Sequence, residues 1–223
     1  FEKLVARRIA GEPLSRILGL REFWSMEFAL TPATFDPRPD SETIIEAVLD
    51  ARPERDKGHR ILDLGTGSGC LLAVLLMEYQ NAQGWAVDCS PEAVSMAAVN
   101  LSNLDLKARA IIKESNWDDK IDGRYDIIVS NPPYIPVGEI ENLDGAVSGY
   151  DPHGALAGGV DGLDAYRSLA VVLRRRLADD GLAVLEHGEG QFDQIVQIVE
   201  SAGLEVIGGR SDLSGQPRCV LIN

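Results

Sequence analysis

The tetrapeptide Asn131-Pro132-Pro133-Tyr134 carries the most specific chemical signal of the chain, directly after an apolar segment that predicts a strand. Amide and aromatic amine nitrogens are poor nucleophiles because their lone pair is delocalised. Two fixed acceptors, the Asn131 side chain and the Pro132 backbone carbonyl, can hold both N–H groups and aim the lone pair at a methyl donor. Tyr134 can pack on a planar substrate or lie near a cation. The tetrapeptide therefore predicts methyl transfer to nitrogen, whereas a plain turn would explain only the two prolines.

A second candidate site is the segment 63–69, which reads Asp-Leu-Gly-Thr-Gly-Ser-Gly. Its glycines let the backbone turn tightly and approach a ligand closely, with helix N–H groups exposed at the turn. The spacing fits neither a phosphate-binding P-loop nor the GxGxxG motif of dinucleotide-binding proteins, so alone it is a weak signal. By itself the segment is also compatible with a tight turn that binds nothing.

Two carboxylates indicate the class of ligand. Asp88 ends the next predicted strand, where a carboxylate can accept hydrogen bonds from both hydroxyls of a ribose. Its alternative role as a helix cap is weaker because Ser90 can fill that role. Asp63 ends its own strand and is placed to hold an ammonium group. An acidic site accepts a cation more readily than a pyrophosphate, so we expect S-adenosylmethionine rather than NAD, with S-adenosylhomocysteine as the product.

Apolar and amphipathic segments predict the elements that position these residues. Strands are expected at 61–64, 84–87, 108–112, 125–129, 181–185, 204–207 and 219–222, and helices near 41–50, 70–79, 91–103, 162–177 and 192–202. Strands that alternate with helices at this spacing imply a sheet covered on both faces. The expected fold class is α/β, a Rossmann-like fold of the class I S-adenosylmethionine-dependent methyltransferases with a mostly parallel seven-stranded sheet.

The remaining segments predict less regular structure. Residues 1–20 predict a basic helix and turn, 21–31 a short hairpin, and 31–39, with three prolines, an extended connector. Ser41 is expected to cap the helix that follows. The stretch 135–161 is expected to have a functional role, because irregular loops of that length are uncommon inside compact domains.

Composition excludes several classes of function. A net charge of −14 repels phosphate backbones and argues against a nucleic-acid substrate, although most of the charge would serve solubility. Three separated cysteines without a CxxC pair suit a reducing cytoplasm, and three histidines without ligand spacing predict no metal site. No apolar run approaches the roughly 20 residues of a membrane span, and no signal peptide is evident. We expect a cytoplasmic monomer.

Several motifs together resemble those of the HemK/PrmC family, the release factor glutamine methyltransferases. Besides the Asn-Pro-Pro-Tyr segment they are Gly11-Glu12-Pro13, Arg21-Glu22-Phe23-Trp24, Pro37-Arg38-Pro39-Asp40-Ser41-Glu42, Glu186-His187-Gly188, and Asp212-Leu213-Ser214-Gly215 with Arg218. The segment 37–42 is similar to the family's Pro-Arg-Pro-Glu-Thr-Glu. The resemblance covers essentially the whole chain and goes beyond what any Asn-Pro-Pro-Tyr enzyme would share.

The resemblance implies N5-methylation of the glutamine side-chain amide in the Gly-Gly-Gln motif of class I peptide chain release factors. It implies that the cofactor is bound by Asp63, Gly65, Thr66, Gly67, Ser68, Gly69, Asp88, Cys89, Asn116, Trp117 and Asn131. Trp117 is interpreted nearly as well as an apolar residue that fills space after the third predicted strand. Asn131, Pro132, Pro133 and Tyr134 are the expected catalytic residues, and they are expected to bind substrate together with Arg38 and Glu42.

The resemblance also divides the chain into three parts. Residues 1–20 are interpreted as the remnant of a helical domain that docks the release factor, 21–50 as a hairpin and linker helix, and 51–223 as the methyltransferase domain. Glu186 and His187 are expected to be structural rather than catalytic. Two alternatives stay open: a ribosomal protein glutamine methyltransferase, and a DNA or RNA adenine amino-methyltransferase, which would need a basic channel that the sequence does not show.

Overall fold

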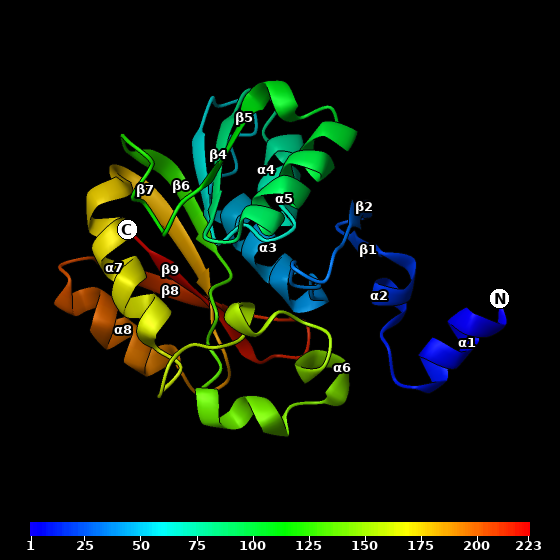
Figure 1. Ribbon diagram of the computed structural model, residues 1–223. Helices are drawn as coiled ribbons and strands as arrows, with labels where there is room; N and C mark the ends of the chain where they lie inside the picture. Colours follow the sequence, from blue (N-terminus) through cyan, green and yellow to red (C-terminus); the bar gives the residue numbers. More distant parts are fainter.

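A seven-stranded sheet forms the centre of the computed structural model, which describes residues 1–223 (Figure 1). Its strands, in the order β5-β4-β3-β6-β7-β9-β8, are parallel except that β9 runs antiparallel to both of its neighbours. This confirms the predicted mostly parallel sheet. The strands are β3 (Arg60–Leu64), β4 (Gln83–Asp88), β5 (Ala110–Glu114), β6 (Tyr125–Ser130), β7 (Leu177–Glu186), β8 (Val206–Ser211) and β9 (Pro217–Ile222).

Helices cover both faces of the sheet (Figure 1). One face carries α3 (Glu42–Ala51), α4 (Cys70–Glu78) and α5 (Pro91–Asn103), and the other carries α7 (Asp164–Arg176) and α8 (Phe192–Ser201). Successive residues of a strand enter opposite layers, so Ile61 packs with α3 and α4 whereas Leu62 packs with α7. Burial on both faces explains why these strands are nearly continuous apolar runs in the sequence.

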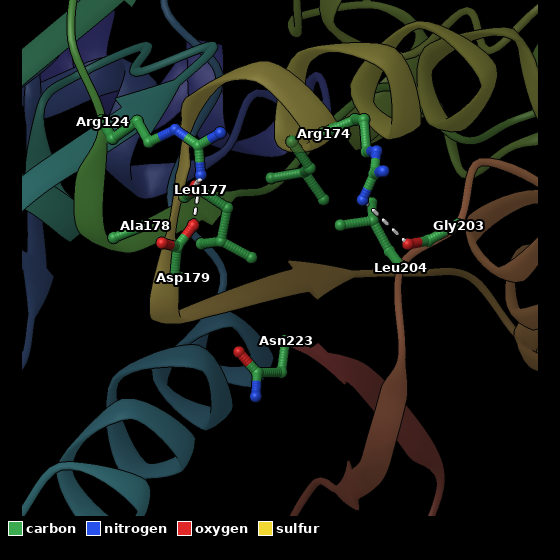
Figure 2. A pocket seen from close by; sticks show the side chains of 9 residues that line it. Arg124, Arg174, Leu177, Ala178, Asp179, Gly203, Leu204 and Asn223 are labelled. Carbon is green, nitrogen blue, oxygen red and sulfur yellow. Dashed lines mark hydrogen bonds and ion pairs between the residues drawn. The ribbon is translucent and has the colours of Figure 1, made fainter.

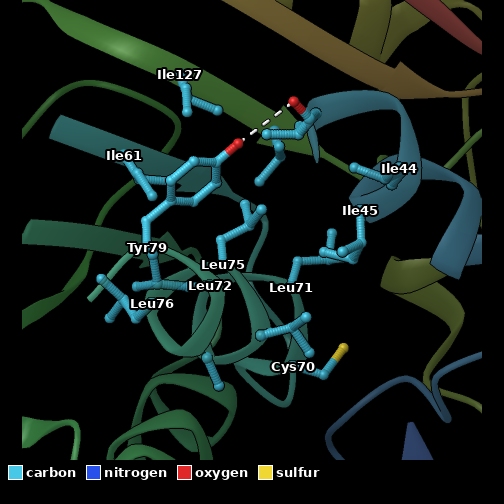
Figure 3. Packing of buried hydrophobic residues seen from close by; sticks show 14 of the residues in the cluster. Ile44, Ile45, Ile61, Cys70, Leu71, Leu72, Leu75, Leu76, Tyr79 and Ile127 are labelled. Carbon is cyan, nitrogen blue, oxygen red and sulfur yellow. Dashed lines mark hydrogen bonds between the residues drawn. The ribbon is translucent and has the colours of Figure 1, made fainter. Parts of the chain in front are cut away.

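The layer formed by α3 and α4 is tied together by Tyr79, which is fully buried at the end of α4 (Figure 3). Its ring lies among Ile61, Leu72 and Leu75. Its hydroxyl donates to the backbone carbonyl of Arg52 at 2.6 Å. A buried tyrosine hydroxyl needs such a partner. Six of the ten residues of α3 are buried, so this helix is part of the hydrophobic core rather than an exposed connection.

The chain before the sheet forms α1 (Glu2–Ile9), α2 (Leu14–Leu18) and a hairpin of β1 (Leu20–Phe23) and β2 (Met26–Ala29), as the sequence predicted. No residue of α1 is buried, and the helix lies at the periphery in Figure 1. Between β6 and α7, the long stretch contains η3 (Val137–Asn142), α6 (Gly145–Ser148) and η4 (His153–Ala155). None of the helices combines the length and the apolar character that crossing a membrane requires.

Ser41 stands at the N-cap position of α3, as expected, but its side chain does not cap the helix. Ser41 ends a 3-10 turn, η1 (Pro39–Ser41), that leads directly into α3. Its own dihedral angles are helical, φ −68° and ψ −15°, and its side chain bonds no N–H group of α3. A capping residue normally adopts extended angles and accepts from the first turn. By contrast, Ser90 caps α5 as expected, accepting from the N–H of Ala93.

Candidate active site

The candidate residues meet at the carboxyl ends of three adjacent parallel strands. Asp63 is in β3 and Asp88 in β4, and Asn131 directly follows β6. Ligands of open α/β folds bind at this edge. A cavity of about 550 Å³ opens there. Of the predicted site residues, those that line it are Arg38, Gly65, Thr66, Gly67, Ser68, Asp88, Cys89, Asn116, Trp117, Asn131, Pro132, Pro133 and Tyr134.

Three of the predicted residues do not line the cavity. Glu42 accepts a hydrogen bond from the backbone N–H of Trp24 at 2.8 Å, on the hairpin side of η1. Gly69 faces α5, and a Cβ atom there would lie 3.1 Å from that of Ala97. Because Gly69 also has a φ of +82°, it allows both the turn and the close approach of α5. Asp63 is fully buried but bonds Thr66, which lines the cavity.

The glycine loop after β3 has most of its backbone donors occupied. The N–H groups of Gly65 and Thr66 both bond the carbonyl of Val87, and the N–H of Gly67 bonds Asp88 Oδ2 at 2.9 Å. The expectation of exposed N–H groups at this turn therefore fails at these residues. Since an anion site needs free donors, the loop provides shape and close approach rather than a cradle for a pyrophosphate.

Asp63 has one satisfied and one unsatisfied carboxylate oxygen. Its Oδ2 accepts from the hydroxyl of Thr66 at 2.6 Å, while its Oδ1 is buried and has no hydrogen-bond partner. Burial raises the pKa of Asp63 to about 7, and the nearby charge of Asp88 contributes in the same direction. A buried acceptor without a donor is costly, so this oxygen fits a ligand that brings a positively charged N–H group.

Asp88 is half-buried at the end of β4 and is fixed from both sides. Its Oδ2 accepts from Gly67 and its Oδ1 from the N–H of Ser90 at 2.9 Å. Each carboxylate oxygen can accept a second hydrogen bond. The two bonds thus orient the carboxylate toward the cavity while leaving capacity for two hydroxyl groups, as a ribose offers.

The Asn-Pro-Pro-Tyr segment presents two free acceptors at the other side of the cavity. Asn131 Nδ2 donates to Ser41 Oγ at 2.9 Å, which leaves Asn131 Oδ1 as the free end of the amide. Neither Oδ1 nor the backbone carbonyl of Pro132 accepts a hydrogen bond within the protein. The segment is anchored further on, where Gln191 Nε2 donates to the carbonyl of Tyr134 at 2.9 Å. The cavity can therefore bind two N–H groups of one substrate.

Tyr134 and Glu186 meet behind this segment. The hydroxyl of Tyr134 lies 3.4 Å from Glu186 Oε1, and burial raises the pKa of Tyr134 well above its usual value. Glu186, at the end of β7, is fully buried, which raises its pKa to about 7 although the Ser41 hydroxyl and the charge of Arg218 lower it. A structural role was expected for Glu186 from the sequence, which gives no sign of its proximity to Ser41.

Sequence reasoning missed the buried ion pairs that shape the cavity rim. Asp151, in the stretch between β6 and α7, pairs with Arg16 of α2 and lies 2.5 Å from Arg38 Nη2. The guanidinium of Arg38 also stacks over Phe35, 5.2 Å from the ring centroid. These pairs bring residues 143–156 to the cavity, where Leu143, Val147 and Leu156 form part of its wall. Only the unusual length of that stretch signalled a role.

Trp117 lies where either of the two roles expected from the sequence is possible. It lines the cavity and also packs against the hydrophobic core formed around α7. Its backbone φ of +48° lies in the left-handed region, which a bulky residue rarely adopts. This conformation turns the chain at the end of β5 so that the indole is held at the cavity edge.

A second cavity lies at the opposite edge of the sheet, between the end of α7 and the start of β7 (Figure 2). Its two arginines are occupied by the protein itself. Arg124 Nη1 bonds Asp179 at 2.7 Å, and Arg174 Nη1 bonds the backbone carbonyl of Gly203 at 3.2 Å. Both arginines of this cavity are thus bound by the protein, whereas the site residues predicted from the sequence gather at the edge that holds Asn131.

Comparison with known proteins agrees with this assignment. The family Methyltransferase small domain matches residues 40–143. A release factor glutamine methyltransferase of Rhodospirillum rubrum is 46% identical over 99% of this chain and 67% of that protein. The one of Bradyrhizobium diazoefficiens is 44% identical over 96% of this chain and 73% of that protein. The crystal structure of a protein-(glutamine-N5) methyltransferase (release factor-specific) from Alicyclobacillus acidocaldarius is 26% identical, with a TM-score of 0.51 over 83% of this chain and 92% of that chain.

Proposed function

The chain belongs to the family of release factor glutamine methyltransferases, and we propose on that premise that it methylates the side-chain amide nitrogen of a glutamine in a peptide chain release factor. Membership of this family confirms the resemblance that the sequence motifs indicated and, with it, a protein-(glutamine-N5) methyltransferase as the class of enzyme. The finer proposal is that the substrate is the glutamine of the Gly-Gly-Gln motif in class I release factors and that the methyl donor is S-adenosylmethionine.

The observation that carries the proposal is the pair of free acceptors, Asn131 Oδ1 and the Pro132 carbonyl oxygen. A primary amide has two N–H groups, and two acceptors fixed in position can hold both of them. With both N–H groups held in the plane of the amide, the lone pair, which lies perpendicular to that plane, is aimed at the methyl donor. One N–H proton leaves to water when the N–C bond forms. Because the prolines remove backbone donors and restrict the turn, no reorganisation is needed during the reaction.

The cavity fits S-adenosylmethionine through residues at its other side. When bound, this cofactor supplies an electrophilic methyl group on a sulfonium. Asp63 Oδ1 is the buried acceptor for the ammonium of its methionine part, and Asp88 is the acceptor for the ribose hydroxyls. Cys89, Asn116 and Trp117 line the part of the cavity beyond Asp88 and form the proposed adenine side. Gly65, Thr66, Gly67 and Ser68 provide the close backbone approach.

The substrate side of the cavity consists of the Asn-Pro-Pro-Tyr segment and Arg38. Tyr134 offers an aromatic face for the planar amide. Glu42, which the sequence analysis placed in this group, is better explained by its bond to Trp24, which holds the η1 turn in place. We expect direct substrate contacts from Arg38 and none from Glu42.

Mass spectrometry of candidate substrates tests the proposal. The protein is incubated with S-adenosylmethionine and, separately, with a class I release factor, ribosomal protein and duplex DNA. The expected result is a gain of one methyl group, about 14 Da, on the Gly-Gly-Gln glutamine of the release factor. Substituting that glutamine by asparagine should abolish the gain. Methylation confined to the ribosomal protein or to DNA would contradict the proposal and identify which alternative holds.

A further inference from the structure

Two buried polar side chains stand directly behind Asn131 and have no part in the chemistry above. Ser41 is 3% exposed and Glu186 is 2% exposed. They come from different elements, the η1 turn and the end of β7, and both approach the segment that follows β6. Buried polar groups in native proteins are normally satisfied by specific partners. Here Ser41 contacts the amide of Asn131, and Glu186 contacts Tyr134 of the same segment.

The function of Asn131 depends on which end of its amide faces the substrate. The two ends have nearly the same shape, but the oxygen accepts hydrogen bonds and the nitrogen donates them. Only the oxygen can bind the N–H group of a glutamine side chain. In the structure Nδ2 of Asn131 bonds Ser41 Oγ, so Oδ1 is the end left for the substrate. A hydroxyl alone would not fix this choice, because it can donate as well as accept.

Glu186 removes that ambiguity. An ionised carboxylate can only accept, and the carboxyl of Glu186 faces the Ser41 hydroxyl. Its Oε2 is buried and accepts no hydrogen bond in the structure, so it is available to accept one from the Ser41 hydroxyl. We propose that Ser41 and Glu186 are positioning residues for Asn131: Glu186 accepts a hydrogen bond from the Ser41 hydroxyl, Ser41 is thereby limited to accepting from Asn131 Nδ2, and Asn131 Oδ1 stays directed at the substrate amide. This inference rests on the proposed role of Asn131.

The turn that carries Ser41 is held from both sides. Asp40 pairs with Arg218 of β9 at 3.0 Å, and Glu42 accepts from the backbone N–H of Trp24 at 2.8 Å. Neither Asp40 nor Glu42 lines the cavity. The two contacts on either side of Ser41 explain why charged residues flank it: they fix the distance between its hydroxyl and Asn131.

The arrangement makes catalysis sensitive to the ionisation of Glu186. Burial raises the pKa of Glu186 to about 7, so the carboxylate forms between pH 6 and 8. The groups that face it are Asp40, Tyr134, Tyr166, His187, Arg218 and Cys219. Burial raises the pKa of Tyr134, Tyr166 and Cys219 and keeps them neutral here, and burial lowers the pKa of His187. Among the groups that face Ser41, Glu186 is therefore the one that titrates in this window, and assays at saturating S-adenosylmethionine keep Asp63 in its ionised form.

The test compares Ser41→Ala, Ser41→Thr and Glu186→Gln with the wild type, using a release factor substrate at saturating S-adenosylmethionine. Ser41→Ala should lower kcat about tenfold or more with an unchanged Kd for the cofactor, because a misplaced positioning group costs up to about a hundredfold. Ser41→Thr keeps the hydroxyl and should keep most of the activity. Ser95→Ala, an exposed serine on α5, is the matched control and should change nothing.

The pH profile separates positioning from a merely structural role. Wild-type kcat should rise between pH 6 and 8, and Glu186→Gln should lower kcat and flatten this rise, since a neutral amide can donate to Ser41 and reverse the chain of hydrogen bonds. A kcat of Ser41→Ala within twofold of the wild type, or an unchanged pH rise in Glu186→Gln, would overturn the inference. If Ser41→Ala no longer binds the cofactor, its kcat does not report on the position of Asn131. The pH profile of Glu186→Gln then decides whether the inference holds. A wild type that methylates no release factor would instead refute the proposed function.

Discussion

The affinity for S-adenosylmethionine should depend on pH through Asp63. This carboxyl is fully buried, its pKa is raised to about 7, and its Oδ1 has no partner. To hold an ammonium group it must be ionised. Below its pKa only the ionised fraction of the protein is competent, and the apparent Kd rises in inverse proportion to that fraction. Relative to pH 8, we expect the Kd to be about twofold weaker at pH 7 and about tenfold weaker at pH 6.

Isothermal titration calorimetry at constant ionic strength measures this dependence. Titrations at pH 6 in two buffers of different ionisation enthalpy should show that one proton is released on binding, because Asp63 loses its proton to make room for the ammonium. S-adenosylhomocysteine carries the same ammonium and should behave alike. Methylthioadenosine lacks the amino-acid part and should bind with little pH dependence. This pair of ligands assigns the effect to the ammonium rather than to the ribose or adenine.

Two variants complete the test of Asp63. Asp63→Asn should bind S-adenosylmethionine more weakly and without the change between pH 6 and 8. Asp88→Asn should weaken binding but keep the change, with its midpoint moved to lower pH, because the charge of Asp88 contributes to the raised pKa of Asp63. A wild-type Kd that differs by less than twofold between pH 6 and 8 would refute the proposed ammonium site, as would an unchanged pH dependence in Asp63→Asn.

Three further variants test separate parts of the site. Asn131→Ala should lower kcat at least a hundredfold in steady-state kinetics, because it removes one of two fixed acceptors. The cofactor Kd, measured by calorimetry, should stay within about threefold of the wild type. Near-normal turnover would exclude the role of Asn131 as an acceptor for the substrate amide. Asp88→Ala should raise the cofactor Kd about 10- to 100-fold in calorimetry, as expected for losing charge-assisted hydrogen bonds, and an unchanged Kd would contradict its ribose role. Gly69→Ala should lower the free energy of unfolding by about 2 kcal/mol in urea denaturation, because the φ of Gly69 is +82° and an added Cβ would press on Ala97. A loss of cofactor affinity without a loss of stability would instead assign Gly69 to cofactor binding.

The accuracy of the predicted strand ends follows the burial of the residues at those ends. β7, predicted from residue 181, begins at Leu177, because its first part contains the exposed Asp179 and Asp180. β3 and β6, at the centre of the sheet, match their predictions to within one residue, since apolar runs buried on both faces have sharp ends in the sequence. β5 and β8 lie at the two edges and begin two residues later than predicted. β5 carries exposed Lys113 and Glu114, and no residue of either strand is fully buried. With little buried surface, an edge strand has no clear boundary in its apolar pattern.

Predicting the site was limited by contacts between distant parts of the chain. The residues at the ends of β3, β4 and β6 were predictable because parallel strands place their carboxyl ends at one edge. Ser41 was not, because a polar residue before a helix indicates a cap, and its actual partner, Asn131, is 90 positions away. The same holds for Asp151, whose partners Arg16 and Arg38 precede it by more than 100 positions. Contacts between residues so far apart in the chain can be recognised only when the arrangement of the strands and helices in space is known.

Polar groups without hydrogen-bond partners in the cavity region distinguish between the two ligand classes with which the glycine-rich loop is compatible, dinucleotides and S-adenosylmethionine. A glycine-rich turn after a strand is shared by proteins that bind dinucleotides and proteins that bind S-adenosylmethionine. Here the N–H groups of Gly65, Thr66 and Gly67 are occupied, while Asp63 Oδ1 at one side, and Asn131 Oδ1 and the Pro132 carbonyl at the other, lack donors. A ligand that brings an ammonium group to Asp63, together with a primary amide at Asn131 and Pro132, satisfies all three acceptors. S-adenosylmethionine with a glutamine side chain is such a pair, whereas NAD brings an anionic pyrophosphate to a loop flanked by the carboxylates of Asp63 and Asp88.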